Sequence, residues 1–348
     1  MNTQLPNLNP RQKAILEVII HEFIKTGEPV SSSTITDKYG INYSSATVRN
    51  EMAVLEDLGF LRQPHTASGR IPEDSAYRMF VNNIIKNKIA PPPIETANTI
   101  DKEYNQIKLQ LGLLLEKTAT LLSNLTNYTS MLLAPQLRKS LFKYLKLVSV
   151  SPSTIMLFMQ STTGALLHKT VELSKPASPE DLERLTYLLN NRLSGKPLEE
   201  LEYLIKEAQR GDPQYELISS IGKESESLLD TEQGIILKGT SRLLNISDSK
   251  DVNNIKVMLE LLEEEKIIAE ILSKTIQLGE ISISIGSENQ LDEMKGCTLI
   301  TAAYKFKEKP VGTLGIIGPR RMPYGEIISI INYTAENFSN KLDTFDSI

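Results

Sequence analysis

Residues 44–59, SSATVRNEMAVLEDLG, decide how the N-terminal part of this 348-residue chain folds. The two serines can cap a helix, and the final glycine can end it. Four apolar residues between them recur every three or four positions, which is the spacing of one buried helix face. They are Val48, Met52, Leu55 and Leu58. The opposite face carries small residues together with Arg49 and Asn50, so the stretch predicts an amphipathic helix with a narrow polar face.

The residues before this helix predict two more helices. Asn9 and Pro10 make a strong helix start, and Gly27 ends the apolar stripe that follows them. Ser31 can cap a short second helix, which Gly40 closes. A connection of only a few residues then leads to the third helix, and this is the length expected of a helix-turn-helix.

The residues after the third helix predict a β-hairpin directly behind it. Residues 60–63 are short and extended, residues 64–69 form a polar turn that ends in glycine, and residues 70–71 resume the extended run. A further helix follows, and the prolines at 91–93 stop it. A helix-turn-helix with such a hairpin is typical of a winged helix-turn-helix DNA-binding domain, which we place at residues 1–89.

The exposed face of the third helix suits the floor of a DNA major groove. Ala46 is small enough to let the helix approach the bases, while Arg49 can bind guanine and Asn50 can bind adenine through paired hydrogen bonds. Hydroxyls and amides at the helix start favour phosphate, and polar groups of the wing favour the backbone or the minor groove. These candidates are Ser44, Ser45, Thr47, His65, Thr66, Ser68 and Arg70. The alternative is an ordinary surface face in water.

The net charge of the chain is −5, which by itself argues against a nucleic-acid partner. The acidic excess is uneven, because residues 1–90 carry ten Lys or Arg against nine Asp or Glu, a net charge of +1. The remaining residues carry a net charge of −6. The N-terminal part is therefore where we expect an anionic partner such as double-stranded DNA.

Composition argues against several other classes of protein. One cysteine and three histidines leave no disulfide framework and little for a metal centre, so we expect no metal and no cofactor. Cys297 is predicted to be a buried structural thiol. No apolar run is long enough to cross a bilayer, and the first residues lack the features of a secretion signal. We therefore expect a cytoplasmic protein that makes no membrane contact.

The rest of the chain predicts one α+β domain interrupted by an insertion. A Pro-rich linker at 90–100 leads to residues 101–195 and 255–345, in which apolar helices alternate with short strands. Residues 196–254 fit this pattern poorly and are interpreted as the insertion. The expected helices are 101–128, 179–193, 255–276 and 326–342, and the expected strands are 143–151, 154–160, 165–173, 280–285, 297–304 and 311–317.

The motifs of this chain resemble those of the HrcA family of bacterial heat-inducible transcription repressors. The resemblance rests on residues 44–52, 55–61 and 63–72, the last of which read QPHTASGRIP. It continues in residues 26–30, 285–288 and 315–324. The chain departs from the family pattern at Ala67, Ser68, Glu73, Arg320 and Pro323.

This resemblance implies an N-terminal winged helix, a GAF-like α+β domain and an inserted dimerising domain. It also implies a repressor of heat-shock chaperone operons that binds the inverted-repeat CIRCE operator as a homodimer. Its activity would depend on the chaperonin GroEL, and it would be found on the nucleoid when bound to its operator.

Two alternatives keep part of this interpretation. A winged-helix repressor gated by a small-molecule effector in the GAF-like domain would bind DNA but respond to another signal. An enzyme with an accessory winged helix would need a cluster of acid, base or nucleophile residues in 94–348. We find no such cluster with recognisable spacing, and we therefore do not expect an enzyme.

Overall fold

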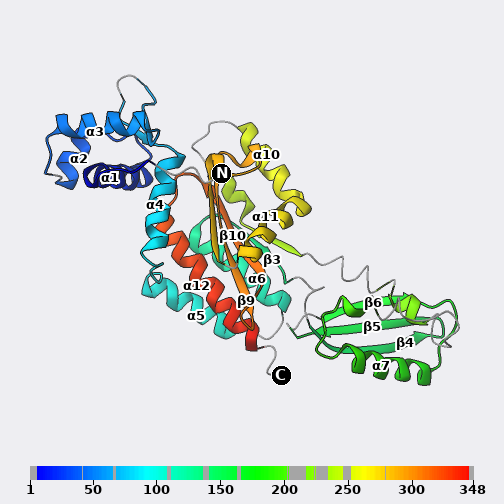
Figure 1. Ribbon diagram of the computed structural model, residues 1–348. Coiled ribbons are helices and arrows are strands. Elements are labelled where there is room, and N and C mark those ends of the chain that lie inside the picture. Colours follow the sequence, from blue (N-terminus) through cyan, green and yellow to red (C-terminus); the bar gives the residue numbers. More distant parts are fainter. Residues whose placement is uncertain are drawn as a thin grey trace.

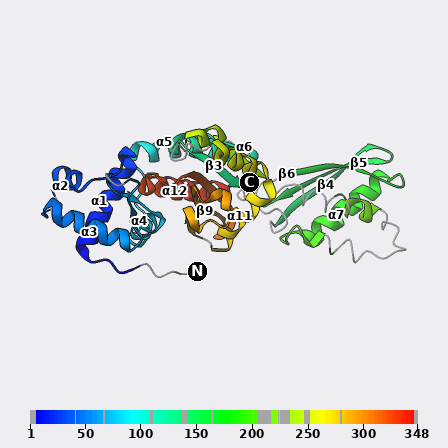
Figure 2. The ribbon, with the colours of Figure 1, turned by 90° about the horizontal axis from the view of Figure 1, so that it is seen from above.

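The computed structural model describes most of the chain between residues 6 and 344. The described ranges are 6–40, 42–65, 68–107, 111–135, 141–162, 166–201, 203, 217–222, 224, 234–245, 252–278 and 280–344. Figure 1 shows three parts, which are a helical domain at one end, a central sheet between helices, and a smaller sheet at the other end. Figure 2 shows these parts in a row, so the molecule is elongated.

The first part is the winged helix-turn-helix that the sequence predicts. Its first three helices begin at the expected caps, because Asn9, Ser31 and Ser44 each accept a hydrogen bond from the first turn. Two short strands pair antiparallel as the wing, and a fourth helix follows. Leu58, expected in the buried stripe, is instead an exposed cap residue. The elements are α1 Pro10–Thr26, α2 Ser32–Tyr39, α3 Ser45–Asp57, β1 Leu61–Arg62, β2 Ile71–Pro72 and α4 Asp74–Lys86.

The central part is a five-stranded antiparallel sheet with the strand order β7-β3-β10-β9-β8. Its strands are β3 Thr129–Leu133, β7 Ile235–Lys238, β8 Ile281–Ile285, β9 Cys297–Phe306 and β10 Lys309–Pro319. The expected strands at 280–285, 297–304 and 311–317 are therefore present as β8, β9 and β10. The sequence did not predict β3, because all five of its residues are buried and its pattern does not alternate.

Helices cover both faces of this sheet (Figure 1). Leu132 and Ile316 belong to the core that includes α6 and α12 on one face, while the neighbouring Met131 and Ile317 belong to the core that includes α11 on the other. This alternation follows the two-residue period of a strand. Helix α5 packs on α6 and α12, and α10 packs on α11. The helices are α5 Ile94–Gln106, α6 Leu111–Thr126, α10 Val252–Glu263, α11 Glu265–Leu278 and α12 Tyr324–Asp343, and the short 3₁₀ turns are η2 Thr240–Asn245, η3 Gly286–Glu288 and η4 Asp292–Met294.

The third part is a separate three-stranded sheet that packs against helix α7 (Figure 2). Its elements are β4 Phe142–Ser151, β5 Thr154–Ser161, β6 Leu166–Glu172 and α7 Pro179–Leu193. The sequence pattern groups these strands with the C-terminal ones and predicts the insertion at 196–254. The structure instead separates β4, β5 and β6 from the central sheet, and the chain rejoins that sheet at Ile235. Hairpin spacing predicts local pairing but not which sheet a hairpin joins.

Three helix boundaries also differ from the expectation. Helix α5 begins at Ile94, directly after Pro93, so the linker is shorter than the expected 90–100. The helix expected at 101–128 is divided, because Ile107 is extended. The helix expected at 255–276 is divided between α10 and α11 at Glu264.

Candidate nucleic-acid interface

Helix α3 presents the polar face that the sequence predicts. Ala46, Arg49 and Asn50 are exposed, while Val48 on the opposite face is fully buried. Within the described part of the chain, neither Arg49 nor Asn50 makes a side-chain hydrogen bond or ion pair. Both side chains are therefore available to a ligand, and their donors and acceptors suit base edges.

The start of α3 is held by its own hydroxyl groups. The Ser44 Oγ accepts from the Thr47 amide at 3.2 Å and lies 2.9 Å from the Thr47 Oγ1. The Ser45 Oγ lies 2.9 Å from the Ser32 Oγ at the start of α2, so this contact ties the two helices of the motif together. The amides of the first turn still point out of the helix start, which is a favourable place for a phosphate.

The wing is closed by a compact turn. The Ser68 hydroxyl donates to the His65 carbonyl at 2.7 Å and accepts from the His65 amide at 3.0 Å. The Gln63 side chain donates to the Ser68 carbonyl at 3.1 Å. His65 is exposed at the tip, whereas Thr66 lies outside the described residues. The Ser68 hydroxyl, which the sequence suggests for DNA contact, therefore holds the turn of the wing together.

Arg70 faces inward, although the sequence predicts that it contacts DNA. Its guanidinium forms an ion pair with Glu56, with 2.8 Å between Nε and Oε2, and only 18% of the side chain is exposed. Glu56 also accepts from the Gln63 amide at 3.0 Å. Because Glu56 lies on α3, this cluster holds the wing against the recognition helix.

A backbone bridge fixes the other side of the wing. The amide of Val30 donates to the Arg70 carbonyl at 2.9 Å, and the Arg70 amide donates to the Val30 carbonyl at 2.8 Å. Gly69 makes this approach possible, because a Cβ atom there would lie 2.3 Å from the Val30 carbonyl oxygen. Sequence reasoning missed the roles of Glu56 and Gly69, although the glycine within the turn was visible.

Most arginines of the N-terminal domain are already paired. Of the five between residues 1 and 90, four form ion pairs with carboxylates, and within the described residues Arg49 is the exception. The pairs are Arg11 with Glu51, Arg62 with Glu73, Arg70 with Glu56, and Arg78 with Glu288. Among the described residues, Arg49 on the face of α3 is thus the arginine of this domain that remains free for a ligand.

Three other predictions concern residues outside this interface. Cys297 is buried as expected, and burial raises the pKa of its thiol to about 12. In the part of the chain that the structure describes, no group of His, Cys, Asp and Glu is arranged to hold a metal ion. None of the described helices is both long and apolar enough to cross a membrane.

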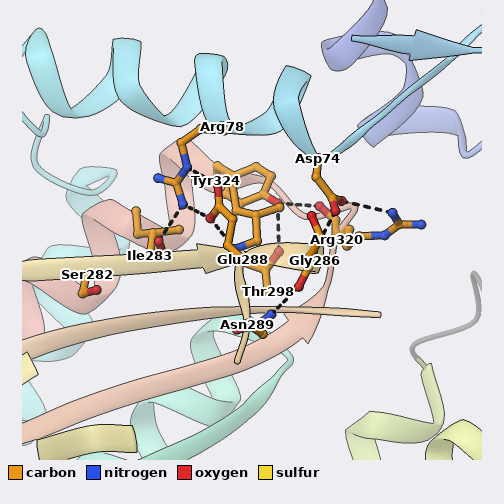
Figure 3. A network of polar contacts seen from close by, with 12 residues as sticks. Asp74, Arg78, Ser282, Ile283, Gly286, Glu288, Asn289, Thr298, Arg320 and Tyr324 are labelled. Carbon is orange, nitrogen blue, oxygen red and sulfur yellow. Dashed lines mark hydrogen bonds and ion pairs between the residues drawn. The ribbon is translucent and has the colours of Figure 1, made fainter. Parts of the chain in front are cut away.

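Sequence reasoning also missed a cluster on α4. Asp74 and Arg78, one turn apart on this helix, contact residues 286–288 and Arg320 of the central part (Figure 3). These partners lie in the two C-terminal segments, 285–288 and 315–324, that resemble the HrcA family. The resemblance was a visible signal, but spacing alone could not reveal the contact.

Three helices, a wing and a free polar face on the recognition helix define a winged-helix DNA-binding protein. Residues 7–86 match the family described as "Winged helix-turn-helix transcription repressor, HrcA DNA-binding", and residues 113–328 match "HrcA protein C terminal domain". The chain belongs to the HrcA family of heat-inducible transcription repressors.

Curated relatives agree with this assignment over the full chain. The heat-inducible transcription repressor HrcA of Pelotomaculum thermopropionicum is 34% identical, covering 97% of this chain and 97% of that protein. The protein of the same name from Natranaerobius thermophilus is 35% identical, covering 97% and 98%. These relatives are named as transcription repressors, so the chain is a regulator and not an enzyme.

A solved structure shows that the fold exists in another protein. A crystal structure of a hypothetical protein aligns with a TM-score of 0.66 at 22% identity, covering 97% of this chain and 100% of that one. This similarity concerns the fold alone.

Proposed function

We propose that the protein is a homodimeric repressor of heat-shock chaperone operons that binds an inverted-repeat operator of the CIRCE type. Family membership supports the target operons, and the free face of α3 supports sequence-specific binding. An inverted repeat mirrors the two-fold symmetry of a dimer, so two copies of α3 would read its two halves. The cytoplasm, and the nucleoid when the operator is bound, are the expected locations.

The observation that carries this proposal is Arg49, which is the arginine of this domain without an ion pair among the described residues, beside Asn50 on the exposed face of α3. We assign Arg49, Asn50 and the small Ala46 to base contact. The start of α3 and the wing would position the protein on the backbone through Ser44, Ser45, Thr47, His65 and Thr66. Ser68 would act indirectly, because its hydroxyl and its amide are both used within the wing turn. Arg70 would act indirectly, because its guanidinium holds the wing to Glu56.

The three-stranded sheet is our candidate for the dimerising unit. Its inner face packs on α7, while its outer face leaves apolar side chains at the surface. Tyr144 is 49% exposed, Val148 41% and Val150 59%. Exposed apolar side chains grouped on one sheet face are typical of a protein interface. The central domain is then the GAF-like part that the family resemblance implies.

The proposed function is tested by operator binding, first with the unmodified protein and then with Arg49 replaced. A footprint on the chaperone promoters of the source organism should show protection of an inverted repeat, and adding the chaperonin GroEL should change its occupancy. Replacing Arg49 by alanine should weaken operator binding by about 1–3 kcal/mol and relax discrimination at one base pair. An equal loss on operator and random DNA would instead make Arg49 a phosphate contact. Arg62→Ala, which removes a paired arginine of the same domain, is the matched control.

The alternative of a small-molecule effector has one observation in its favour. A cavity of about 290 Å³ lies between α11 and β8, lined by Ile271, Thr275 and Leu299 among others. Glu288 borders this cavity and also pairs with Arg78 of the winged-helix domain. A thermal-shift screen of metabolites tests this alternative, since tight binding of one would favour an effector-gated repressor.

A further inference from the structure

The junction between the winged helix and the central domain is built from charged side chains at defined positions. Asp74 and Arg78 are four residues apart and lie on the same face of α4. Asp74 accepts from the Ser287 amide at 2.8 Å and from the Arg320 Nη1 at 3.0 Å. Figure 3 shows these contacts converging from α4 and from two loops of the central domain.

Arg78 makes the second half of the junction. Its Nε donates to the Glu288 Oε1 at 2.6 Å, and its Nη2 donates to the Ile283 carbonyl at 2.6 Å and also to the second Glu288 oxygen. A planar guanidinium that engages both carboxylate oxygens and a carbonyl has one favoured orientation. The contact therefore fixes the orientation of α4 relative to the central domain as well as the distance between them.

The partners on the central domain are themselves held in place. Glu288 accepts from the Ile285 amide at 2.8 Å, and the buried Asn289 side chain donates to three carbonyls around the same loop. Tyr324, which is fully buried, donates to the Arg320 carbonyl at 2.6 Å. Arg320 and Glu288 are thus presented by rigid segments.

Gly286 is shaped for this contact. Its φ of +53° is one that other residues rarely adopt, and a Cβ atom there would lie 2.3 Å from both carboxylate oxygens of Asp74. Only glycine lets the Asp74 carboxylate reach the Ser287 amide. The loop is therefore built around an acidic side chain from another domain.

A second set of contacts restrains rotation about α4. The Arg321 Nη1 donates to the Ile24 carbonyl at 3.3 Å, near the end of α1, and its guanidinium lies 6.0 Å from the centre of the Phe23 ring. The rings of Tyr77 and Tyr324 lie 5.6 Å apart. Two helices of the winged-helix domain are thus attached to one loop of the central domain, residues 320–324.

We propose that Asp74, Arg78, Glu288 and Arg320 are positioning residues that fix the direction in which each subunit presents α3. This rests on the proposed function, because it concerns a dimer on an inverted repeat. Two recognition helices must reach half-sites separated by a set number of base pairs. A junction that fixes each helix relative to the dimer body therefore determines which spacing the dimer accepts, without touching any base.

The test uses the full-length protein and measures two quantities. One is the dependence of affinity on the distance between the two half-sites, and the other is the affinity for a single half-site. The DNA probes are duplexes carrying the footprinted operator with its spacer unchanged or changed by two base pairs, and a duplex with one half-site. The unmodified protein should prefer the native spacer at least tenfold. Arg78→Glu should reduce that preference to about threefold or less, while single half-site binding stays within twofold.

Two further variants separate the junction from general damage. Glu288→Arg alone should reproduce the loss. The double variant Arg78→Glu with Glu288→Arg should regain part of the spacer preference, because the ion pair is restored while the hydrogen bonds to the Ile283 carbonyl and from the Ile285 amide are not. Lys238→Glu, which breaks an ion pair with Glu116 away from the junction, should change nothing. Full spacer preference in Arg78→Glu, or no recovery in the double variant, would overturn the proposal.

A distance measurement without DNA tests the fixed junction independently of the proposed function. Spin labels on cysteines replacing Lys13 and Lys266, both exposed, would report the distance between the two domains in labelled subunits diluted with unlabelled ones. The buried Cys297 should not take up label. The distance distribution should be narrow in the unmodified protein and broad in Arg78→Glu. A narrow distribution in both would refute the fixed junction, whereas failure to bind any chaperone promoter would refute only the proposed function.

Discussion

The wing depends on a contact that one methyl group should break. Gly69 lies so close to the segment after α1 that a Cβ atom would be 2.3 Å from the Val30 oxygen and 2.8 Å from the Pro29 carbonyl carbon. Its backbone does not require a positive φ, so the effect of Gly69→Ala is steric and not conformational. Both neighbours are backbone atoms, which cannot move aside as a side chain can.

The expected magnitude follows from the hydrogen bonds that must separate. The Val30 and Arg70 backbones exchange two hydrogen bonds of 2.9 Å and 2.8 Å, and neither survives a displacement that relieves the overlap. At about 0.5–1.5 kcal/mol each, the wing should lose roughly 1–3 kcal/mol of local stability. Hydrogen exchange at these two amides should then accelerate about 5- to 150-fold.

The assay is amide hydrogen exchange on the full-length protein, with operator binding as a second readout. Gly296→Ala is the matched control, because nothing lies within 4 Å of its added methyl group and its φ is not positive. Operator affinity should fall in Gly69→Ala while Arg49 on α3 remains exposed. Unchanged protection at Val30 and Arg70 would refute the argument that the glycine permits the wing to dock.

Three further predictions test charges and burial. Replacing Arg70 by alanine should loosen the wing, so it should weaken operator binding and lower thermal stability. Arg62→Ala, which removes the partly exposed partner of Glu73, should lower thermal stability less. Equal melting temperatures of the two variants would contradict the inward role of Arg70. Hydrogen bonds from Lys38 and Tyr39 lower the pKa of the buried Glu22, so its contribution to stability is present above the ordinary carboxyl pKa and is lost as the pH falls through the lowered value. Acid titration of thermal stability should show this loss in the unmodified protein and less of it in Glu22→Gln. The Cys297 thiol, with a pKa raised to about 12 by burial, should not react with a thiol reagent at pH 8 until the protein is unfolded, and rapid labelling of the native protein would contradict its burial.

Local patterns predicted the winged helix well, because each of its signals acts over a few residues. Asn9, Ser31 and Ser44 cap the helices that follow them, and the apolar stripe of α3 faces the core at Val48 and Met52. Caps and helical periodicity depend on neighbours within one turn or two. The sequence alone was therefore sufficient to place the polar face of α3.

The rest of the molecule depends on partners that are far apart in the chain. Strands β4 to β6 have the same hairpin spacing as strands of the central sheet, so the pattern did not reveal that they form a sheet of their own. The inward orientation of Arg70 depends on Glu56, and that of Arg78 on Glu288, which is 210 residues away. No periodicity links such residues, although the family resemblance marked 285–288 as a segment to explain.

The ion pairs change what the charge of the chain implies. The sequence places a net charge of +1 on residues 1–90 and −6 on the remainder, which suggests a weakly basic DNA-binding domain on an acidic body. The structure shows that Arg70 holds the wing against α3, that Arg78 joins the two domains, and that Arg62 pairs with Glu73 near the surface. Positive charge that neutralises a carboxylate releases few counterions from DNA, so it adds little to non-specific binding. Under the proposed function, specificity would come from base contact by Arg49 and Asn50, and from two copies of α3 held at the correct spacing. Arg70 and Arg78, whose charges are unavailable to DNA, would then contribute to operator recognition by fixing the wing and the direction of α3.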